Sequence, residues 1–364
     1  MTHNNSLSDG LIKLDPKAFQ AEVDGKVTHL FILKNKNGVE IAVTNYGGFV
    51  VAVMVPDKNG EYADVVLGHG SLQDYRQTPE PYLGSLVGRY GNRIANGKFT
   101  LEGREYTLAV NNGPNTLHGG LNGFNAVVWD AEQLNAQTLK LNYLSVDGEE
   151  GFPGNLSVEV IYHLSNDNAL EISYQAMTDK KTIINLTQHS FFNLAGNANP
   201  TPAICDQLLT INADYYTPMD KVSIPTGEIA AVAGTPMDFR TPHVIGERIE
   251  EPFEQLVFGK GYDHCYVLNK REAGELSFAA KVVDPKSGRT LEVYTTEPGV
   301  QLYTGNWLGG FEGKYGATYP ERSAICLETQ HFPDSPNKPH FPSVVLRPGE
   351  IYTQKCIYKF GVEK

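Results

Sequence analysis

Cysteine is scarce in this sequence, and the few cysteines are scattered. Four occur in 364 residues, with no C-x-x-C pair and without the close spacing of a small disulfide-stapled domain. No histidines stand two or four residues apart in the way that many zinc sites require. We therefore expect buried, reduced thiols and no metal site. The cysteines are Cys205, Cys265, Cys326 and Cys356.

Positive charge is also in short supply. The chain carries 30 Lys and Arg against 42 Asp and Glu, a net charge of −12. Nucleic acids and anionic membrane surfaces are bound through clusters of Lys and Arg, and the sequence contains no such cluster. The composition argues against nucleic acid and against a membrane as partners.

Long hydrophobic runs are missing as well. No segment approaches the roughly 20 apolar residues that a membrane-spanning helix needs. Residues 1–10 lack the basic head and apolar core of a signal peptide. These absences predict a soluble, cytoplasmic protein, and they leave open whether it is a monomer or a homodimer.

Helical periodicity is rare, and alternation with period two takes its place. Hydrophobic residues make up 41% of the chain, which is enough for a full core. The alternating segments are short and end at Gly, Asn, Asp or Pro, as antiparallel strands do. No linker divides the chain, so we expect one all-β domain over residues 1–364, a large β-sandwich. One segment, 243–259, has helical spacing. The predicted strands are 27–33, 39–44, 49–55, 99–108, 139–144, 156–162, 170–174, 281–283, 291–295 and 351–358.

Two glycine-rich polar segments are candidate ligand loops. The segment 88–97, Gly-Arg-Tyr-Gly-Asn-Arg-Ile-Ala-Asn-Gly, holds Arg89 and Arg93 among glycines and asparagines. A guanidinium held in this way suits hydroxyls or carboxylates, and the spacing is not that of a phosphate loop. In the segment 115–120, His118 precedes a glycine pair that lets the backbone approach a ligand closely.

Two further segments place polar residues on predicted strands. If 182–193 is one strand, then Asn185, Thr187, His189 and Phe191 share a face. A polar row of this kind is expected to line a groove.

Later in the chain, 262–268 opens a strand with Asp263 and His264. Adjacent strand residues point to opposite faces, so these two are not expected to act in one site. The chain also lacks the G-x-S-x-G turn of serine hydrolases.

Glu328 stands at a place suited to a catalytic base. The segment 323–327 alternates as a strand, and Pro333 and Pro336 then prevent further ladder pairing. This pattern predicts that Glu328 lies at a strand end, where a stiff backbone would hold a carboxylate within hydrogen-bond reach of a substrate.

Five of these segments together resemble the aldose 1-epimerase (galactose mutarotase) family, in the family's order and over most of the chain. They are Gly88-Arg-Tyr-Gly-Asn-Arg-Ile-Ala-Asn-Gly-Lys-Phe99, Asn115-Thr-Leu-His-Gly-Gly120, Asn185-Leu-Thr-Gln-His-Ser-Phe-Phe-Asn-Leu194, Tyr262-Asp-His264 and Leu327-Glu-Thr-Gln-His-Phe-Pro-Asp-Ser-Pro-Asn337.

The resemblance implies a large twisted antiparallel β-sandwich, the galactose mutarotase-like super-sandwich, with few short helices and a sugar groove. It implies Glu328 as catalytic base and His189 as catalytic acid. Where the family often has a small residue before the Asn-Arg pair, this chain has Tyr90-Gly91, which puts the neighbouring sugar contact in doubt. The substrate contacts implied by the resemblance are Asn92, Arg93, His118, Asp263 and Gln301.

The implied reaction interconverts the α and β anomers of free hexoses such as galactose and glucose. It needs a base at the anomeric hydroxyl and an acid at the ring oxygen, and no cofactor. We expect the carboxylate of Glu328 to raise the imidazolium fraction of His189. Trp307 could offer a flat face to the sugar, although tryptophan more often packs in a core.

Three alternatives stay open. A hexose-6-phosphate 1-epimerase on the same fold should carry added basic residues for the phosphate. A non-catalytic sugar-binding protein should have lost the acid or the base. A glycoside hydrolase needs two carboxylates flanking the bond, for which Asp263 and Glu328 are the available pair.

Overall fold

The computed structural model describes residues 10–363. Residues 1–9, on which the expectation of a chain without a signal peptide partly rests, lie outside the described residues. Within residues 10–363, no helix is long and apolar enough to cross a membrane. All four cysteines are free, as expected; three are buried and Cys205 is half-buried.

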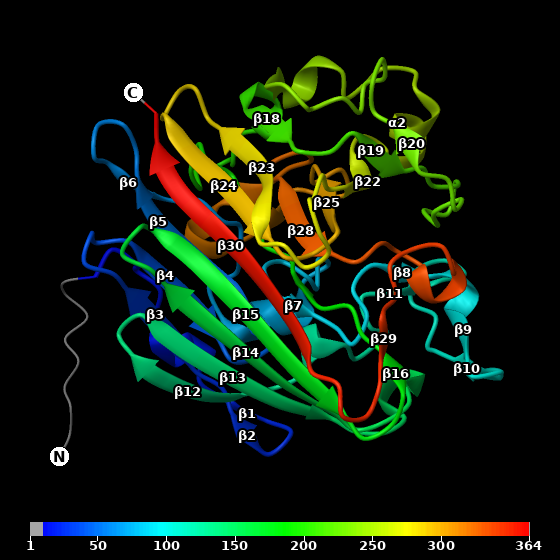
Figure 1. Ribbon diagram of the computed structural model, residues 1–364. Coiled ribbons are helices and arrows are strands. Elements are labelled where there is room, and N and C mark those ends of the chain that lie inside the picture. The colour runs from blue at the N-terminus through cyan, green and yellow to red at the C-terminus, as the bar shows by residue number, and fades with distance from the viewer. Residues whose placement is uncertain (1–9, 364) are drawn as a thin grey trace.

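A nine-stranded antiparallel sheet forms one layer of the molecule and faces the viewer in Figure 1. The C-terminal strand β30 lies at its centre, between β15 and β24, so the two halves of the chain meet in this sheet. In spatial order the strands are β12 (Asp130–Asn135), β13 (Thr138–Ser145), β14 (Leu156–Leu164), β15 (Ala169–Thr178), β30 (Tyr352–Val362), β24 (Arg289–Thr295), β23 (Ser277–Val283), β18 (Leu208–Ile211) and β21 (His243–Val244).

Two smaller antiparallel sheets pack against its inner side. One contains β3 (Leu30–Lys34), β4 (Glu40–Thr44), β5 (Val50–Pro56) and β6 (Tyr62–Asp64). The other contains, in spatial order, β20 (Ala230–Ala231), β19 (Tyr215–Thr217), β22 (Asp263–Val267), β25 (Gly299–Tyr303) and β28 (Cys326–Gln330). The remaining strands form two-stranded ladders: β1 (Glu22–Val23) with β2 (Lys26–Val27), β7 (Leu86–Val87) with β17 (Thr187–Gln188), β8 (Arg93–Ile94) with β11 (Thr116–Leu117), β9 (Lys98–Leu101) with β10 (Arg104–Thr107), β16 (Thr182–Ile183) with β29 (Val345–Leu346), and β26 (Phe311–Glu312) with β27 (Thr318–Tyr319).

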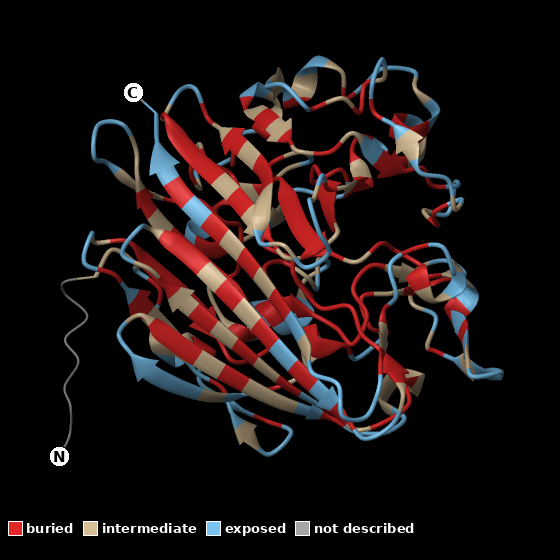
Figure 2. Ribbon diagram, in the orientation of Figure 1, coloured by how far each residue is buried: buried red, intermediate tan, exposed pale blue. Residues whose placement is uncertain are grey.

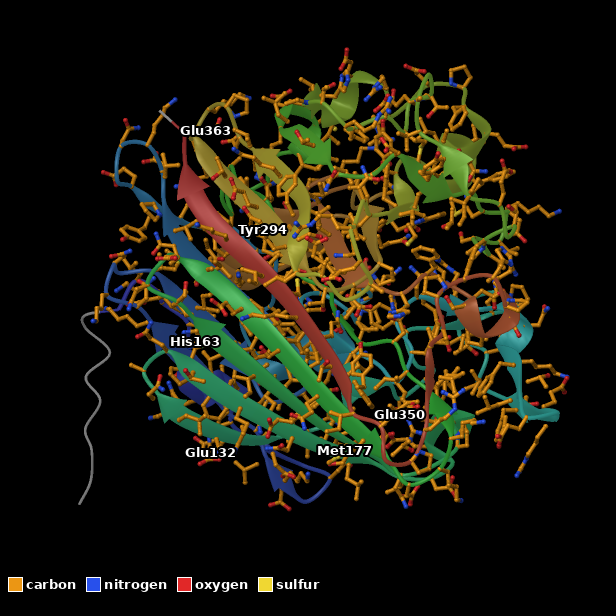
Figure 3. The ribbon with its side chains drawn as sticks, in the orientation of Figure 1. Glu132, His163, Met177, Tyr294, Glu350 and Glu363 are labelled. Carbon is orange, nitrogen blue, oxygen red and sulfur yellow. The ribbon has the colours of Figure 1, made fainter. Side chains whose placement is uncertain are left out.

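Strict alternation of side chains explains the two layers. Along β14 and β15, buried and accessible residues alternate almost without exception, which Figure 2 shows as bands along the strands. Outward side chains such as His163 and Met177 cover the solvent face (Figure 3). On the inner face, the hydroxyl of Tyr162 donates to Gly48 O (2.8 Å) and that of Tyr358 to Leu327 O (2.9 Å). The nine-stranded sheet thus packs against both smaller sheets, and the predicted antiparallel β-sandwich is confirmed.

Helices are few and short among the described residues. The helical prediction for 243–259 is right only in part, because the segment holds β21, the 3₁₀ turn η6 (Ile245–Glu247) and α2 (Glu254–Gly259). The sequence analysis did not identify α1 (Leu72–Gln77), which is capped by Ser71 Oγ accepting from the Asp74 amide (3.1 Å). Six residues are too few to show a hydrophobic period. The other 3₁₀ turns are η1 (Pro16–Phe19), η2 (Ala95–Gly97), η3 (Phe124–Ala126), η4 (Glu149–Gly151), η5 (Ile204–Asp206), η7 (Lys314–Gly316) and η8 (Ser335–Asn337).

Candidate active site

A cavity of about 560 Å³ opens where loops from the first half of the chain meet β22, β25 and β28. Six of the seven site residues implied by the resemblance line it: Asn92, Arg93, His118, His189, Asp263 and Glu328. The seventh, Gln301, does not line this cavity, but its amide donates to Asp263 Oδ1 (2.8 Å). Residues far apart in the sequence therefore converge on one small volume.

Glu328 lies in the middle of a strand, which corrects the expectation of a strand end. Strand β28 continues through Gln330, and Glu328 pairs with Gln301 of β25. Its side chain is buried, and Oε2 has no hydrogen-bond partner. Burial raises the pKa of Glu328 well above its usual range; the Asp263 carboxylate adds to the rise, and Arg93 opposes it.

His189 lies directly after the two-residue strand β17 and is not part of one continuous strand. The segment 182–193 forms only β16 and β17, because its backbone also bonds to loops: the His189 amide donates to Ser85 O (2.9 Å). The imidazole stacks on Phe191 with ring centroids 4.8 Å apart. This leaves His189 Nε2 3.4 Å from Glu328 Oε1.

The protonation of this pair differs from expectation. Burial lowers the pKa of His189 to about 3. The prediction that Glu328 raises the imidazolium fraction of His189 is therefore wrong, because the cost of burying a charged imidazole dominates its pKa. Burial therefore acts against the charged form of both groups, raising the pKa of the Glu328 carboxyl and lowering the pKa of the His189 imidazole.

His118 is arranged as a hydrogen-bond donor. The Asn92 amide donates to His118 Nδ1 (3.0 Å), and the His118 amide donates back to Asn92 O (3.0 Å). Since Nδ1 accepts, the proton of a neutral ring lies on Nε2. Burial lowers the pKa of His118 well below its usual value, so the ring stays neutral. Tyr82 packs edge-on against it, with ring centroids 4.5 Å apart.

The same tautomer bears on metal binding. One donor atom each of His118, His189 and Glu328 lies within 4.8 Å of the other two, close enough to surround an ion. Nε2 of His118 carries a proton as long as Nδ1 accepts from the Asn92 amide, so it has no lone pair for a metal. The three residues fit a hydrogen-bonding role better than a metal site.

Arg93 and Asp263 bring opposite charges to the cavity wall. Arg93 Nε donates to Asn112 Oδ1 (3.0 Å), which orients the guanidinium. Burial raises the pKa of Asp263, while Arg93 and the Gln301 amide oppose the rise. As the strand alternation predicts, Asp263 lines the cavity and His264 does not.

The other arginine of the loop 88–97 has a structural role. The side chain of Arg89 is buried, and Nη1 donates to Pro153 O (2.8 Å) and Gly154 O (3.0 Å), away from the cavity. Tyr90, the departure from the family pattern, is likewise buried, and its hydroxyl donates to Phe332 O (3.0 Å). Within the loop 88–97, Asn92 and Arg93 therefore line the cavity, and Arg89 and Tyr90 do not.

Several cavity residues were missed by the sequence analysis. Glu80 stands between Pro79 and Pro81, with its Oε1 accepting from the Tyr82 amide (3.3 Å). Burial raises the pKa of Glu80 to about 7. A single Glu in a proline-rich turn does not indicate a site residue by its sequence alone. Its place in the cavity can be recognised only from the folded structure, where the turn lies near Glu328.

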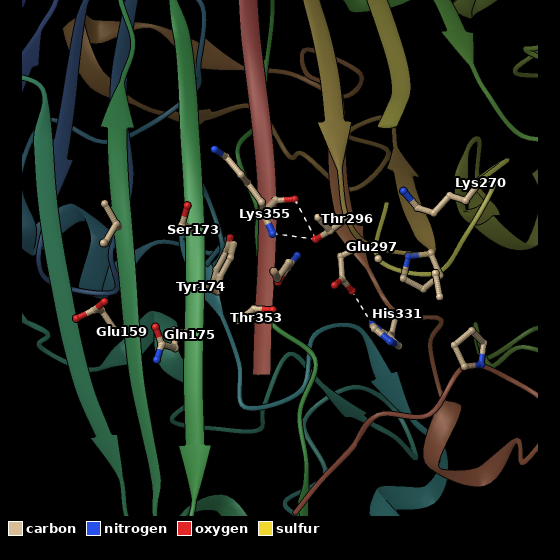
Figure 4. A pocket seen from close by; sticks show the side chains of 16 residues that line it. Glu159, Ser173, Tyr174, Gln175, Lys270, Thr296, Glu297, His331, Thr353 and Lys355 are labelled. Atoms are coloured by element: carbon tan, nitrogen blue, oxygen red, sulfur yellow. Dashed lines mark hydrogen bonds and ion pairs between the residues drawn. The ribbon is translucent and has the colours of Figure 1, made fainter. Parts of the chain in front are cut away.

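The second Thr-Gln-His tripeptide leads elsewhere. His331 lines a separate cavity of about 530 Å³ beside β15 and β30 (Figure 4). Its Nδ1 lies 2.6 Å from Glu297 Oε2. Burial lowers the pKa of His331, but the Glu297 carboxylate outweighs this and the pKa is raised overall. The two Thr-Gln-His tripeptides thus contribute to different cavities, in agreement with their different flanking residues.

These features define a class of protein. A β-sandwich whose cavity holds a buried carboxyl beside an imidazole, with charged and amide groups around them, is suited to acid/base chemistry on a small polyhydroxyl compound. Residues 29–359 match the family model of aldose 1-epimerase, and the chain belongs to that family.

Similar proteins cover nearly the whole chain. The galactose mutarotase of Bos taurus is 47% identical over 325 residues, 89% of this chain and 92% of the bovine protein. The aldose 1-epimerase of Escherichia coli K12 is 36% identical over 342 residues, 93% of this chain and 97% of that protein. Among solved structures, galactose 1-epimerase from Lactobacillus acidophilus is 29% identical with a TM-score of 0.80, covering 95% of this chain and 98% of its own. An aldose epimerase homologue from C. elegans has a TM-score of 0.85 at 29% identity, covering 93% and 100%.

Proposed function

We propose that this protein is an aldose 1-epimerase that interconverts the α and β anomers of free hexoses, galactose and glucose among them, without a cofactor. The observation that carries the proposal is the separation of 3.4 Å between His189 Nε2 and Glu328 Oε1 inside a buried cavity. A carboxyl group and an imidazole this close together can accept a proton from one oxygen of the sugar and supply a proton to another.

The reaction is balanced by this pair alone. Glu328 removes the proton from the anomeric hydroxyl, the O1 electron pair forms the C1=O bond, and the C1–O5 bond breaks. The ring oxygen takes a proton from His189. Rotation about C1–C2 and the reverse sequence give the other anomer, so the pair returns to its starting state. Each proton transfer contributes about 10² to 10⁴ in rate.

Substrate binding prepares the charged form of the pair. A sugar hydroxyl that donates to Glu328 stabilises its carboxylate, as hydrogen bonds to a charged form do. The proton then passes to His189, which becomes the acid. Burial disfavours the charged form of both groups, and the hydrogen bonds from the sugar offset this cost.

The surrounding residues hold the sugar. His118 Nε2 and the Arg93 guanidinium act as donors, and Asp263 accepts from a sugar hydroxyl. Asn92 contributes by orienting His118, because its backbone amide donates to His118 Nδ1. Gln301 is a positioning residue, since its amide orients the Asp263 carboxylate.

The charge of the cavity favours a free sugar over a sugar phosphate. Arg93 and Lys221 are its two cationic residues, against the carboxyl groups of Glu80, Asp263 and Glu328. A dianionic phosphate would need an excess of cationic donors. The retained acid and base likewise speak against a non-catalytic sugar-binding protein.

The remaining features of the proposal are a single domain over residues 1–364, a small-molecule aldose as partner with no nucleic acid and no membrane, a monomer or homodimer, and a cytoplasmic location. A charge of −12 supports the absence of a nucleic acid partner.

Polarimetry tests the proposal. Freshly dissolved α-D-galactose or α-D-glucose is followed with wild-type protein, Glu328→Gln, His189→Asn and no protein. We expect wild type to accelerate the approach to equilibrium and both variants to lose that acceleration. If folded wild-type protein leaves the uncatalysed rate unchanged for both sugars, the proposal is wrong, and glucose 6-phosphate is the next substrate to test.

A further inference from the structure

Trp307 is the exposed tryptophan of this chain. The sequence holds two tryptophans; Trp129 is 1% exposed in the core, whereas Trp307 is 57% exposed and lines the catalytic cavity. A large aromatic ring left open to water at the edge of a cavity offers binding surface that the fold itself does not use.

The backbone beneath this ring is firmly held. Asn306 Nδ2 donates to Gly259 O (3.0 Å) and Tyr262 O (2.9 Å), which ties the loop to the end of α2. The Trp307 amide donates to Tyr303 Oη (3.1 Å). Tyr303 in turn packs edge-on against His189, with ring centroids 6.4 Å apart. The indole is therefore presented from a rigid support in contact with the catalytic residues.

One face of the indole is already taken. The ammonium of Lys260 lies over the ring, 3.9 Å from its centroid. A cation in this place is attracted by the negative face of the ring. Trp307 nevertheless stays 57% exposed, so much of its surface is open to an apolar partner.

We propose that Trp307 is a specificity-determining residue that stacks on the apolar face of the pyranose ring and favours galactose over glucose. The inference rests on the proposed function, since it requires a hexose in this cavity. In galactose the axial O4 leaves the C–H groups at C3, C4 and C5 turned toward one ring face. This patch carries partial positive charge and suits the negative face of an indole. In glucose the equatorial O4 breaks up the patch.

Fluorescence tests the contact without depending on catalysis. Trp307 is exposed and Trp129 is buried in the core, so a sugar-dependent change in emission that disappears in Trp307→Phe reports on Trp307. We expect galactose to shift or quench the emission saturably and glucose to do so at several-fold higher concentration. Sucrose, which is non-reducing and bulkier, controls for solvent effects.

Steady-state kinetics test the specificity. Trp307→Ala should raise KM for galactose about 10-fold and KM for glucose about 2-fold, and leave kcat within about 2-fold for both, because one aromatic stacking contact changes affinity by roughly 2- to 13-fold. Trp307→Phe should restore most of the difference. Tyr215→Ala, which removes an exposed aromatic ring that does not line the cavity, is the matched control.

The outcomes separate the two proposals. Equal KM changes for both sugars, or a galactose-dependent emission change that persists in Trp307→Phe, would overturn the stacking inference while mutarotation stands. If wild type binds galactose through Trp307 but does not accelerate mutarotation, the stacking holds and the catalytic proposal fails. Circular dichroism of each variant confirms that it is folded.

Discussion

Gln301 and Glu328 stand directly opposite one another on the adjacent strands β25 and β28. The Gln301 side chain reaches diagonally to β22, where its amide donates to Asp263 Oδ1 (2.8 Å). Three neighbouring strands thus place Asp263, Gln301 and Glu328 side by side. The relative positions of these three side chains depend on the register of this small sheet.

Gln301→Ala should weaken sugar binding without abolishing the chemistry. Loss of the amide frees the Asp263 carboxylate to rotate, so we expect KM to rise about 5- to 10-fold, within the range of one typical hydrogen bond, with kcat little changed. Initial rates over a range of galactose concentrations measure this. A fall in kcat with unchanged KM would instead place Gln301 in the proton transfer.

The acid and the base should act as a unit. Glu328→Gln and His189→Asn should each lower kcat about 10²- to 10⁴-fold. The double variant should be little slower than either single variant, since a proton taken up by one group must be matched by a proton supplied by the other. Polarimetry of all three proteins gives the comparison, and multiplicative losses would show that the two residues contribute independently.

Burial of Glu328 should cost stability above acidic pH. Its pKa is raised on folding, so the folded protein binds the proton more tightly than the unfolded chain, and stability falls as pH rises above the unfolded value of about 4.5. Glu328→Gln removes this penalty. At pH 8 we expect the free energy of unfolding of the variant to exceed that of wild type by about 1 to 3 kcal/mol. The variant should therefore unfold at a higher temperature.

At pH 4 the two proteins should be nearly equal, because the carboxyl is then protonated in both states. Thermal unfolding at several pH values checks the trend. A constant difference across the pH range would mean that the substitution acts through packing and not through charge.

Glu80 should shape the pH dependence of the reaction. Its pKa is raised by burial to about 7, and its charge further raises the pKa of Glu328. Asp263 and Arg93 are the other charged groups that act on Glu328, and His189 faces it. Glu80→Gln removes one negative charge, so we expect the acidic limb of the kcat/KM profile to move to lower pH.

Glu80→Asp keeps the charge and serves as the matched control, with a profile close to that of wild type. The measurement is kcat/KM for galactose from pH 4 to 9, corrected for the uncatalysed rate. Superimposable profiles for wild type and Glu80→Gln would show that Glu80 does not influence the pair.

Substitution of the two arginines in the loop 88–97 should have different effects, one on stability and the other on activity. Arg89 is buried with several carbonyl acceptors, and burial lowers its pKa to about 10. Arg89→Ala leaves those acceptors unpaired, so we expect a loss of about 2 to 4 kcal/mol in stability and near-normal activity of the folded fraction. Arg93→Ala should lower kcat/KM on the order of 10²-fold with little change in stability. Urea unfolding and polarimetry on both variants test the contrast; similar effects of the two would refute it.

Much of the fold was predictable because the side-chain pattern of a strand depends on which of its two sides is buried. The alternation in 139–144, 156–162 and 170–174 follows directly from one buried and one solvent-facing side of a sheet. The segment 182–193 was harder, since its backbone bonds to loops that a local pattern does not reveal. Helix α1 was missed because it is shorter than two turns.

The candidate site was predictable as a set of motifs and not as a geometry. By itself, the sequence determined the family, the strand pattern and the residue types available for acid/base chemistry, because these depend on side-chain order alone. Tertiary structure alone decided that His189 meets Glu328, that Arg93 and not Arg89 lines the cavity, and that Glu80 and Trp307 join the cavity. It also decided that the pKa of Glu328 is raised and that of His189 lowered, because the cost of charging a group depends on how completely the surrounding chain excludes water from it.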